Sequence, residues 1–140
     1  MNIYYVHDWI VYLGGAYNVL CEMLNVFQGP LHTIVYDEKN FQPTDLKNIE
    51  IRTSFIQKLP FGVKKFRFYF PLFPLAIEQF DLSKADVVIS SSHFVAKGAL
   101  THSDQYHICY CHTPLLPAWD FYHEFLTSRV NEKGFFAKLY

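Results

Sequence analysis

Apolar runs and segments of helical periodicity alternate along this chain. The run Ile3–Val6 predicts a short buried strand. After Gly14 and Gly15, apolar residues recur at the three- and four-residue spacing of one helix face. Gly29 and Pro30 end that helix, and His32–Tyr36 predicts the next strand. Strand, glycine turn, helix and strand form one βαβ unit, in which the strands are parallel and the crossover is right-handed.

The alternation continues through the rest of the sequence. Further strands are predicted at Ile49–Arg52, Asp86–Ser90 and Tyr106–Tyr110. Further helices are predicted at Leu75–Phe80, Phe94–Leu100 and Ala118–Leu126. We therefore expect an α/β fold: a Rossmann-like, open, mostly parallel sheet with helices on both faces.

Composition narrows the class of protein. The 140 residues suit one domain, and a hydrophobic fraction of 51% indicates a folded chain. A formal net charge of −1 argues against a dedicated nucleic-acid binder, which usually carries a basic footprint. Aromatic residues make up 19% of the chain, a content typical of surfaces that meet apolar or flat partners.

The cysteines and the N-terminal region predict a cytoplasmic location. Cys21, Cys109 and Cys111 are odd in number and lack the spacing of a disulfide framework. His7 and Asp8 interrupt the N-terminal apolar residues, so we expect no signal peptide. Charges and prolines interrupt every longer apolar stretch, so we expect no transmembrane helix.

Ligands of open parallel sheets bind beyond the carboxyl ends of the strands. This rule selects three loops, which are His7–Gly15, Ser90–Phe94 and Cys111–Pro117. All three carry polar groups, and their convergence predicts a pocket. Its expected lining residues are Asp8, Ser92, His93 and Thr113.

The pair Gly14–Gly15 has two interpretations. Glycine is common in turns for conformational reasons alone. Without Cβ atoms, however, the free N–H groups at a helix N-terminus are also open to an anion such as phosphate. No Gly-Lys-Ser/Thr follows the pair, so a P-loop is excluded.

His112 follows the last predicted strand, at the mouth of the expected pocket. With His107, Cys109 and Cys111 it suggests a zinc site, although these residues lie in one cluster and zinc usually draws on two. Buried strand cysteines are the simpler interpretation. Cys–His nucleophilic catalysis would require an orienting third group, and none stands at a recognisable spacing. A neutral His112 that hydrogen-bonds a substrate hydroxyl fits this position, as does a purely structural histidine.

The segment Ile51–Ile77 combines basic and aromatic residues and contains no acid. Basic side chains attract anionic lipid headgroups, and aromatic rings favour the membrane interface. Nucleic-acid stacking and a core segment with solvated lysines are the alternatives. The neutral chain and the many aliphatic residues favour a membrane surface. The side chains expected to face it are Lys58, Lys64, Lys65 and Arg67.

Several ordered motifs together resemble the N-terminal, acceptor-side domain of bacterial family 4 glycosyltransferases, which have the two-domain GT-B fold. The motifs are VHDW…GGA, TIVYD, RTSFIQKLP, PLFPLAIEQFDLS, DVVISSSHFVAKG and HICYCHTP…AWDFYHEFL. The resemblance runs from Met1 to about Leu126.

The resemblance implies retaining transfer of a sugar from a nucleotide-sugar to a lipid-linked or saccharide acceptor, in cell-surface polysaccharide synthesis. It implies no essential metal or other cofactor. Gly14 and Gly15 would contact the donor diphosphate or sugar, and His112 would be the catalytic residue that hydrogen-bonds the transferred sugar. The basic–aromatic segment would lie on the inner face of the cytoplasmic membrane.

The sequence also departs from the family pattern. Tyr17-Asn18 replaces the common Glu-Lys, and Leu115-Leu116-Pro117 replaces Met-Arg-Tyr, which removes a positive charge beside the pocket. Glu124 and Glu132 have the spacing of the family's E-x₇-E motif but lack its glycine-rich loop. We therefore expect residues 1–140 to be a single truncated domain, inactive alone, which requires a donor-binding domain or self-associates through the surface that such a domain covers.

Overall fold

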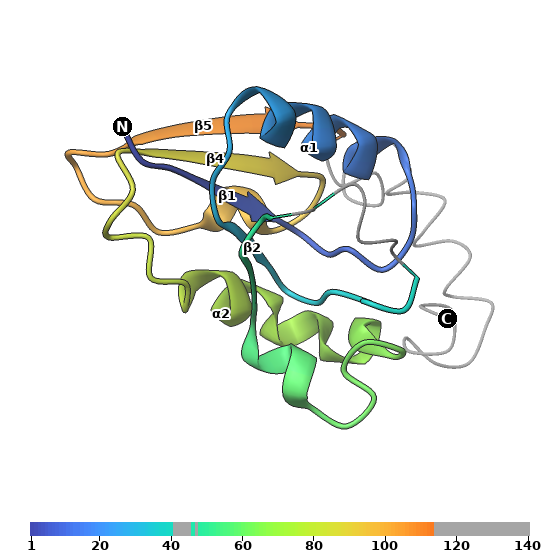
Figure 1. Ribbon diagram of the computed structural model, residues 1–140. Coiled ribbons are helices and arrows are strands. Elements are labelled where there is room, and N and C mark those ends of the chain that lie inside the picture. Colours follow the sequence, from blue (N-terminus) through green and yellow to red (C-terminus); the bar gives the residue numbers. More distant parts are fainter. Residues whose placement is uncertain (41–45, 47, 114–140) are drawn as a thin grey trace.

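The computed structural model describes residues 1–40, 46 and 48–113. In this part of the chain, five parallel strands form one sheet in the order β3-β2-β1-β4-β5 (Figure 1). The strands are β1 (Ile3–His7), β2 (Leu31–Thr33), β3 (Ile51–Thr53), β4 (Val87–Ser92) and β5 (Tyr106–Cys111). The predicted open, Rossmann-like α/β fold is confirmed.

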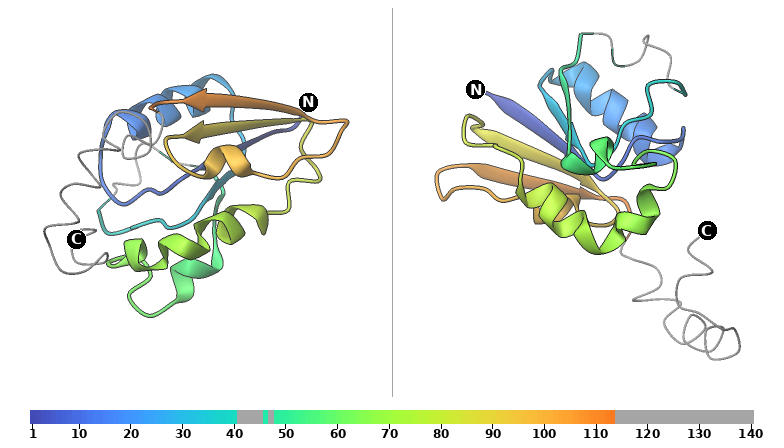
Figure 2. Two further views of the ribbon diagram at one scale, coloured as in Figure 1. Left: turned by 180° about the vertical axis from the view of Figure 1, so that it is seen from behind. Right: turned by 90° about the horizontal axis from the view of Figure 1, so that it is seen from below.

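Helices cover both faces of the sheet (Figure 2). Helix α1 (Gly15–Val26) packs Leu20 and Leu24 against Tyr5 of β1 on one face. The other face carries Val6 of β1 and packs against four short helices. These are the 3₁₀ helices η1 (Phe55–Lys58), η2 (Phe66–Leu72) and η3 (Ala96–Gly98), and helix α2 (Phe73–Glu78).

Strand β1 also fixes the end of α1. The buried Tyr5 hydroxyl donates toward the carbonyl oxygens of Phe27, at 2.8 Å, and Met23, at 3.1 Å. The Met23 carbonyl also accepts from the Phe27 N–H, so the Tyr5 hydroxyl adds a second partner there and ties the C-terminal end of α1 to β1. The chain then returns through Gly29 and Pro30 to β2, as predicted.

Some element boundaries differ from prediction. The strand predicted at His32–Tyr36 is Leu31–Thr33, and directly after it the Ile34 carbonyl accepts from the Ser54 hydroxyl at 2.8 Å. The helix predicted at Phe94–Leu100 is only the 3₁₀ turn η3, and backbone N–H groups at and before its start donate to the Asp8 carboxylate. The helix predicted at Ala118–Leu126 lies outside the described residues.

Candidate functional site

The carboxyl ends of β1, β4 and β5 and the N-terminus of α1 lie at one end of the molecule (Figure 1). The loops after these strands are the ones selected from the sequence, although residues 114–117 of the third loop lie outside the described residues. The parallel register places His7 directly beside Ser91. Because strand side chains alternate, both project on the same sheet face as Tyr5, which is the face that α1 covers.

Asp8 is fully buried and anchors the loop that follows β4. One carboxylate oxygen accepts from the backbone N–H groups of His93 and Phe94, at 2.7 and 2.9 Å. The other accepts from those of Val95 and Ala96, both at 2.7 Å. Its oxygens are therefore occupied by the fold, and Asp8 supports the site without facing a ligand.

His93 lies against the same carboxylate, with Nδ1 3.1 Å from an Asp8 oxygen but outside hydrogen-bond geometry. Burial raises the pKa of Asp8, yet the nearby His93 ring and the backbone N–H groups outweigh it and lower the pKa from 3.8 to about 2. Ser92 is also buried, and its hydroxyl lies 3.4 Å from Asp8. Thr113 is exposed.

A second chain of polar groups connects β1, β4 and the residue after β5. His7 Nδ1 lies 2.8 Å from the Ser91 carbonyl oxygen and 3.1 Å from its Oγ. Ser91 Oγ in turn lies 2.8 Å from His112 Nε2. Sequence reasoning missed His7 and Ser91. Their shared strand parity, once β1 and β4 are paired, is the signal that could have found them.

Burial lowers the pKa of both His7 and His112. The His7 pKa falls from 6.5 to about 4, because the desolvation of the ring outweighs the nearby Asp8 carboxylate and the bond to Ser91. The His112 pKa is lowered by burial and by His93, against the opposing influence of Asp8. Both rings are therefore neutral at pH 7, and His112 can act as a hydrogen-bond partner without carrying charge.

The glycine pair has no packing or conformational reason within the described chain. Gly14 precedes α1 in an extended conformation, with φ −161° and ψ 175°, which other residues also adopt. A Cβ added at Gly14 or Gly15 would meet no atom of the described residues within 4 Å. No side chain in this part of the chain caps the helix, and its first turn carries no acid. The backbone N–H groups here are thus open to an anion.

Trp9 joins the site to the basic–aromatic segment. Its ring meets His93 edge-on, at 4.4 Å between centroids, and lies 5.3 and 5.8 Å from Phe66 and Phe73. Phe94, which follows His93, lies 4.8 Å from Phe70. A continuous aromatic cluster therefore runs from the candidate site to η2.

The cysteines of β5 were predicted to be buried, and that prediction is wrong. Cys109 and Cys111 are exposed on β5, which is an edge strand of the described sheet. His107 Nε2 is bonded to Ser90 Oγ at 2.9 Å. Among the described residues, no cluster of three or more His, Cys, Asp or Glu side chains could hold a metal ion.

The segment Ile51–Ile77 divides into buried and exposed aromatic residues. Phe66 and Phe73 are buried in the core, as the alternative interpretation of a core segment predicts. The exposed rings are Phe55, Phe61, Phe68 and Phe70. Lys58, Lys64, Lys65 and Arg67 are also exposed. Arg52 bonds Glu50 at 2.8 Å and is separate from this group.

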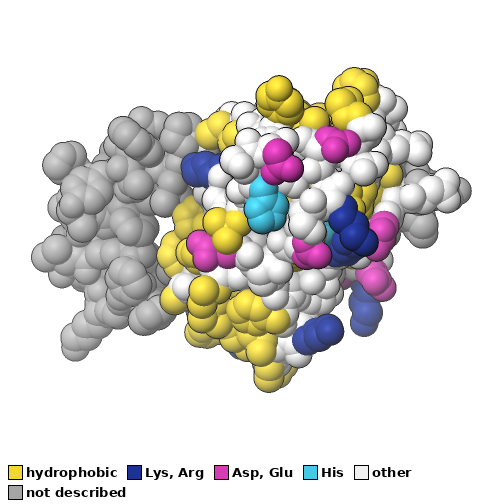
Figure 3. Space-filling model, turned by 90° about the vertical axis from the view of Figure 1, so that its left-hand side faces the viewer, with side chains coloured by type: hydrophobic (Ala, Val, Ile, Leu, Met, Phe, Trp, Pro, Cys, Tyr) yellow, Lys and Arg dark blue, Asp and Glu magenta, His cyan; other side chains and the backbone are white. Residues whose placement is uncertain are grey.

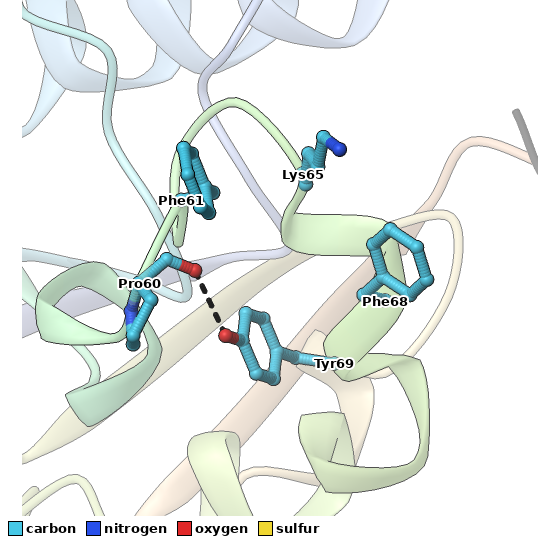
Figure 4. Close-up of a pocket in the computed structure, with 5 residues that line it drawn as sticks. All are labelled: Pro60, Phe61, Lys65, Phe68 and Tyr69. Carbon is cyan, nitrogen blue, oxygen red and sulfur yellow. Dashed lines mark hydrogen bonds between the residues drawn. The ribbon is translucent and has the colours of Figure 1, made fainter.

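Phe61 is the most exposed of these rings, at 68%, and occupies an unusual turn. Its φ of 55° is left-handed, which is rare for a bulky residue. Gly62 fixes the turn, since a Cβ there would lie 2.0 Å from the Ile56 carbonyl oxygen. An open pocket of about 410 Å³ is lined by Pro60, Phe61, Lys65, Phe68 and Tyr69 (Figure 4).

Contacts within this turn hold the exposed rings and one charge together. The Tyr69 hydroxyl donates to the Pro60 carbonyl at 2.8 Å (Figure 4). Lys65 Nζ lies 5.7 Å from the Phe61 ring and 5.8 Å from the Phe68 ring, within the range of cation–π attraction. We call Phe61, Lys65 and Phe68 the η1–η2 tip.

The opposite end of the molecule, where the strands begin, has a different character. Charged side chains of both signs are interspersed there, and hydrophobic side chains gather toward its margins (Figure 3). In the part of the chain that the structure describes, no helix combines the length and apolarity needed to cross a bilayer.

Comparison with protein-family models, with curated proteins and with solved structures finds no match to this chain.

Proposed function

We propose that this chain is the acceptor-side domain of a retaining glycosyltransferase, which transfers a sugar from a nucleotide-sugar to a lipid-linked or saccharide acceptor in cell-surface polysaccharide synthesis. The observation that carries the proposal is the open, glycine-lined N-terminus of α1, at the same end and on the same sheet face as the His7–Ser91–His112 chain. The motif resemblance supports the same assignment.

Each group has a role that its chemistry allows. The N–H groups at Gly14 and Gly15, with the positive end of the α1 dipole, suit the diphosphate or sugar of the donor. Neutral His112 suits a sugar hydroxyl. The cations that stabilise a leaving diphosphate would come from a donor-binding domain or partner chain, because no Lys or Arg belongs to the described site. The proposed chemistry requires no metal.

We also propose attachment to the inner face of a membrane, through the η1–η2 tip and the basic residues beside it. Exposed Phe61 and Phe68 would enter the headgroup region, while Lys64, Lys65 and Arg67 attract anionic lipid. The contacts of Trp9 with His93 and Phe66 bring this surface close to the site. A lipid-linked acceptor could then reach the site from the bilayer.

The alternative is a non-catalytic module that binds membranes or partner proteins. The exposed apolar side chains of β5 favour it, namely Tyr106, Ile108 and Tyr110. Such a module would not recognise a nucleotide, so ligand binding separates the two functions.

Amide spectra and thermal unfolding of the full chain test the proposal. UDP, GDP, their common sugar conjugates and inorganic pyrophosphate are added separately. We expect a nucleotide-sugar to shift the amide resonances of Gly14 and Gly15 and to raise the unfolding temperature. If none of the nucleotide-sugars shifts either amide, even at millimolar concentration, the donor site is wrong. If a nucleotide-sugar does bind, supplying a donor-binding domain of this family should restore sugar transfer.

Cosedimentation with vesicles tests membrane attachment. We expect binding to phosphatidylcholine vesicles that contain phosphatidylglycerol, and weaker binding in high salt, because the attraction of exposed lysines is screened. Equal binding to neutral vesicles at every salt concentration would exclude the electrostatic part of the proposal.

A further inference from the structure

Ser91 lies between two histidines, and the distances fix the direction of each hydrogen bond. His7 Nδ1 is 2.8 Å from the Ser91 carbonyl oxygen, which can only accept, so Nδ1 carries the hydrogen. Ser91 Oγ is 3.1 Å from the same nitrogen and therefore accepts from it as well. His7 is buried and neutral, so this N–H is its single ring donor.

The hydroxyl hydrogen of Ser91 is then available to His112. Ser91 Oγ lies 2.8 Å from His112 Nε2, so the O–H donates to Nε2 and a neutral His112 carries its own hydrogen on Nδ1. A hydrogen on Nε2 would direct two N–H groups at one oxygen and turn the hydroxyl hydrogen away from both rings. The geometry thus favours one tautomer of His112.

We propose that Ser91 is a positioning residue, which holds His112 in the Nδ1–H tautomer and presents a fixed N–H donor to an oxygen of the bound nucleotide-sugar. The ligand part of this inference rests on the proposed function, whereas the tautomer does not. With Nε2 occupied by Ser91 and a hydrogen on Nδ1, His112 has no nitrogen free to accept a proton. It therefore recognises a hydroxyl oxygen of the transferred sugar and does not serve as a general base.

The neighbouring serine supplies a matched control. Ser90 Oγ lies 2.9 Å from Nε2 of His107, on the opposite face of β4. Ser90 and Ser91 are both buried, and each bonds a histidine at or just after β5. Replacing one serine should alter its own histidine and leave the other unchanged.

Long-range ¹H–¹⁵N spectra of the histidine rings in the full chain, near pH 7.5, test the assignment. In the wild type we expect the ¹⁵N shift of His112 Nε2 to be that of an unprotonated nitrogen. Ser91→Ala should move His112 toward the Nε2–H tautomer, and Ser90→Ala should leave it unchanged. A wild-type His112 with its hydrogen on Nε2 overturns the inference without any variant, as does a Ser91→Ala protein with an unchanged His112.

Ligand binding separates this inference from the proposed function. If a nucleotide-sugar binds, we expect Ser91→Ala to weaken it roughly tenfold, and Ser91→Thr, which keeps the hydroxyl, to bind as the wild type does. Should Ser91→Thr not fold, Ser91→Cys retains a weaker donor and should give an intermediate affinity. Equal affinity in wild type and Ser91→Ala removes the ligand part. If the spectra show the expected tautomers but no nucleotide-sugar binds, the proposed function is overturned. The role of Ser91 in setting the tautomer of His112 is then unaffected.

Discussion

The two halves of the loop between β1 and α1 differ in how completely the fold uses them. At its start, Asp8 is buried and accepts four backbone N–H groups from residues 93–96. At its end, Gly14 and Gly15 are exposed, and among the described residues no side chain caps the helix and a Cβ at either position would meet no atom within 4 Å. The fold accounts for Asp8 and gives no reason for the glycines.

This difference separates structural from functional residues within one loop. A polar residue with all its partners inside the chain contributes to stability. A glycine that neither packing nor backbone conformation among the described residues requires leaves its backbone open to a ligand. Changes at Asp8 should therefore lower stability first, and changes at the glycine pair should weaken binding without lowering stability.

The largest effect is expected for Asp8→Asn. The amide keeps the shape of the carboxylate but turns an N–H₂ group toward backbone donors, so at least one buried pair of N–H groups loses its acceptor. We expect the free energy of unfolding to fall by about 3 kcal/mol or more, measured by urea denaturation at pH 7. Asp104→Asn, at an exposed carboxylate, should change it by less than about 0.5 kcal/mol. If Asp8→Asn lowers the free energy of unfolding only slightly, Asp8, like the glycines, is not required by the fold.

Acidification should lower the free energy of unfolding through the buried His7, by almost as much as Asp8→Asn does. Its pKa is about 4 in the folded chain and 6.5 in the unfolded chain, so the unfolded state binds more protons between these values. The contribution of neutral His7 to the free energy of unfolding is fully present above pH 6.5. It is lost as the pH falls toward 4, by about 3 kcal/mol in total.

Urea unfolding at several pH values from 7.5 to 4.5 measures this loss above the range in which Asp8 titrates. His7→Asn can still donate an amide N–H to the Ser91 carbonyl but does not titrate, so its profile should be flatter. The other histidines with a lowered pKa, His32, His107 and His112, contribute to the remaining slope, and so does Glu50 at the acid end of the range. An unchanged slope in His7→Asn would contradict the assignment.

The sequence predicted the sheet well because its strands are short apolar runs bounded by turn residues. It predicted the loops of the site because parallel strands bring their carboxyl ends to one edge. Asp8 was expected to line a pocket, whereas it anchors η3; sequence spacing cannot reveal that its partners lie 85 residues away. The register that pairs His7 with Ser91 is likewise a tertiary property. The exposure of Cys109 and Cys111 depends on what covers β5, which strand periodicity does not determine.

The glycine pair should show the opposite behaviour to Asp8. Gly14→Ala and Gly15→Ala introduce no clash, and alanine at Gly15 favours the helix, so we expect the stability to stay equal or rise by up to about 1 kcal/mol. The added Cβ should nevertheless weaken nucleotide-sugar binding at least tenfold, because the anion can no longer approach the backbone. Gly98→Ala, where a Cβ also meets no atom, is the matched control and should leave binding unchanged. Equal affinity in all three variants would make the pair an ordinary turn.

The smallest effect on stability is expected at the η1–η2 tip, where the same reasoning applies to an exposed side chain. Asn tolerates the left-handed φ of Phe61 better than Phe does, so Phe61→Asn should raise the free energy of unfolding by a few tenths of a kcal/mol up to about 1 kcal/mol. It also removes the ring that we propose to enter the lipid, so cosedimentation with anionic vesicles should fall several-fold. Phe55→Asn, at a ring that is 37% exposed, should reduce that cosedimentation less. Such a loss would support the proposal that this strained, exposed ring is retained for membrane contact, whereas full vesicle binding by Phe61→Asn would leave the strain at this turn without that explanation.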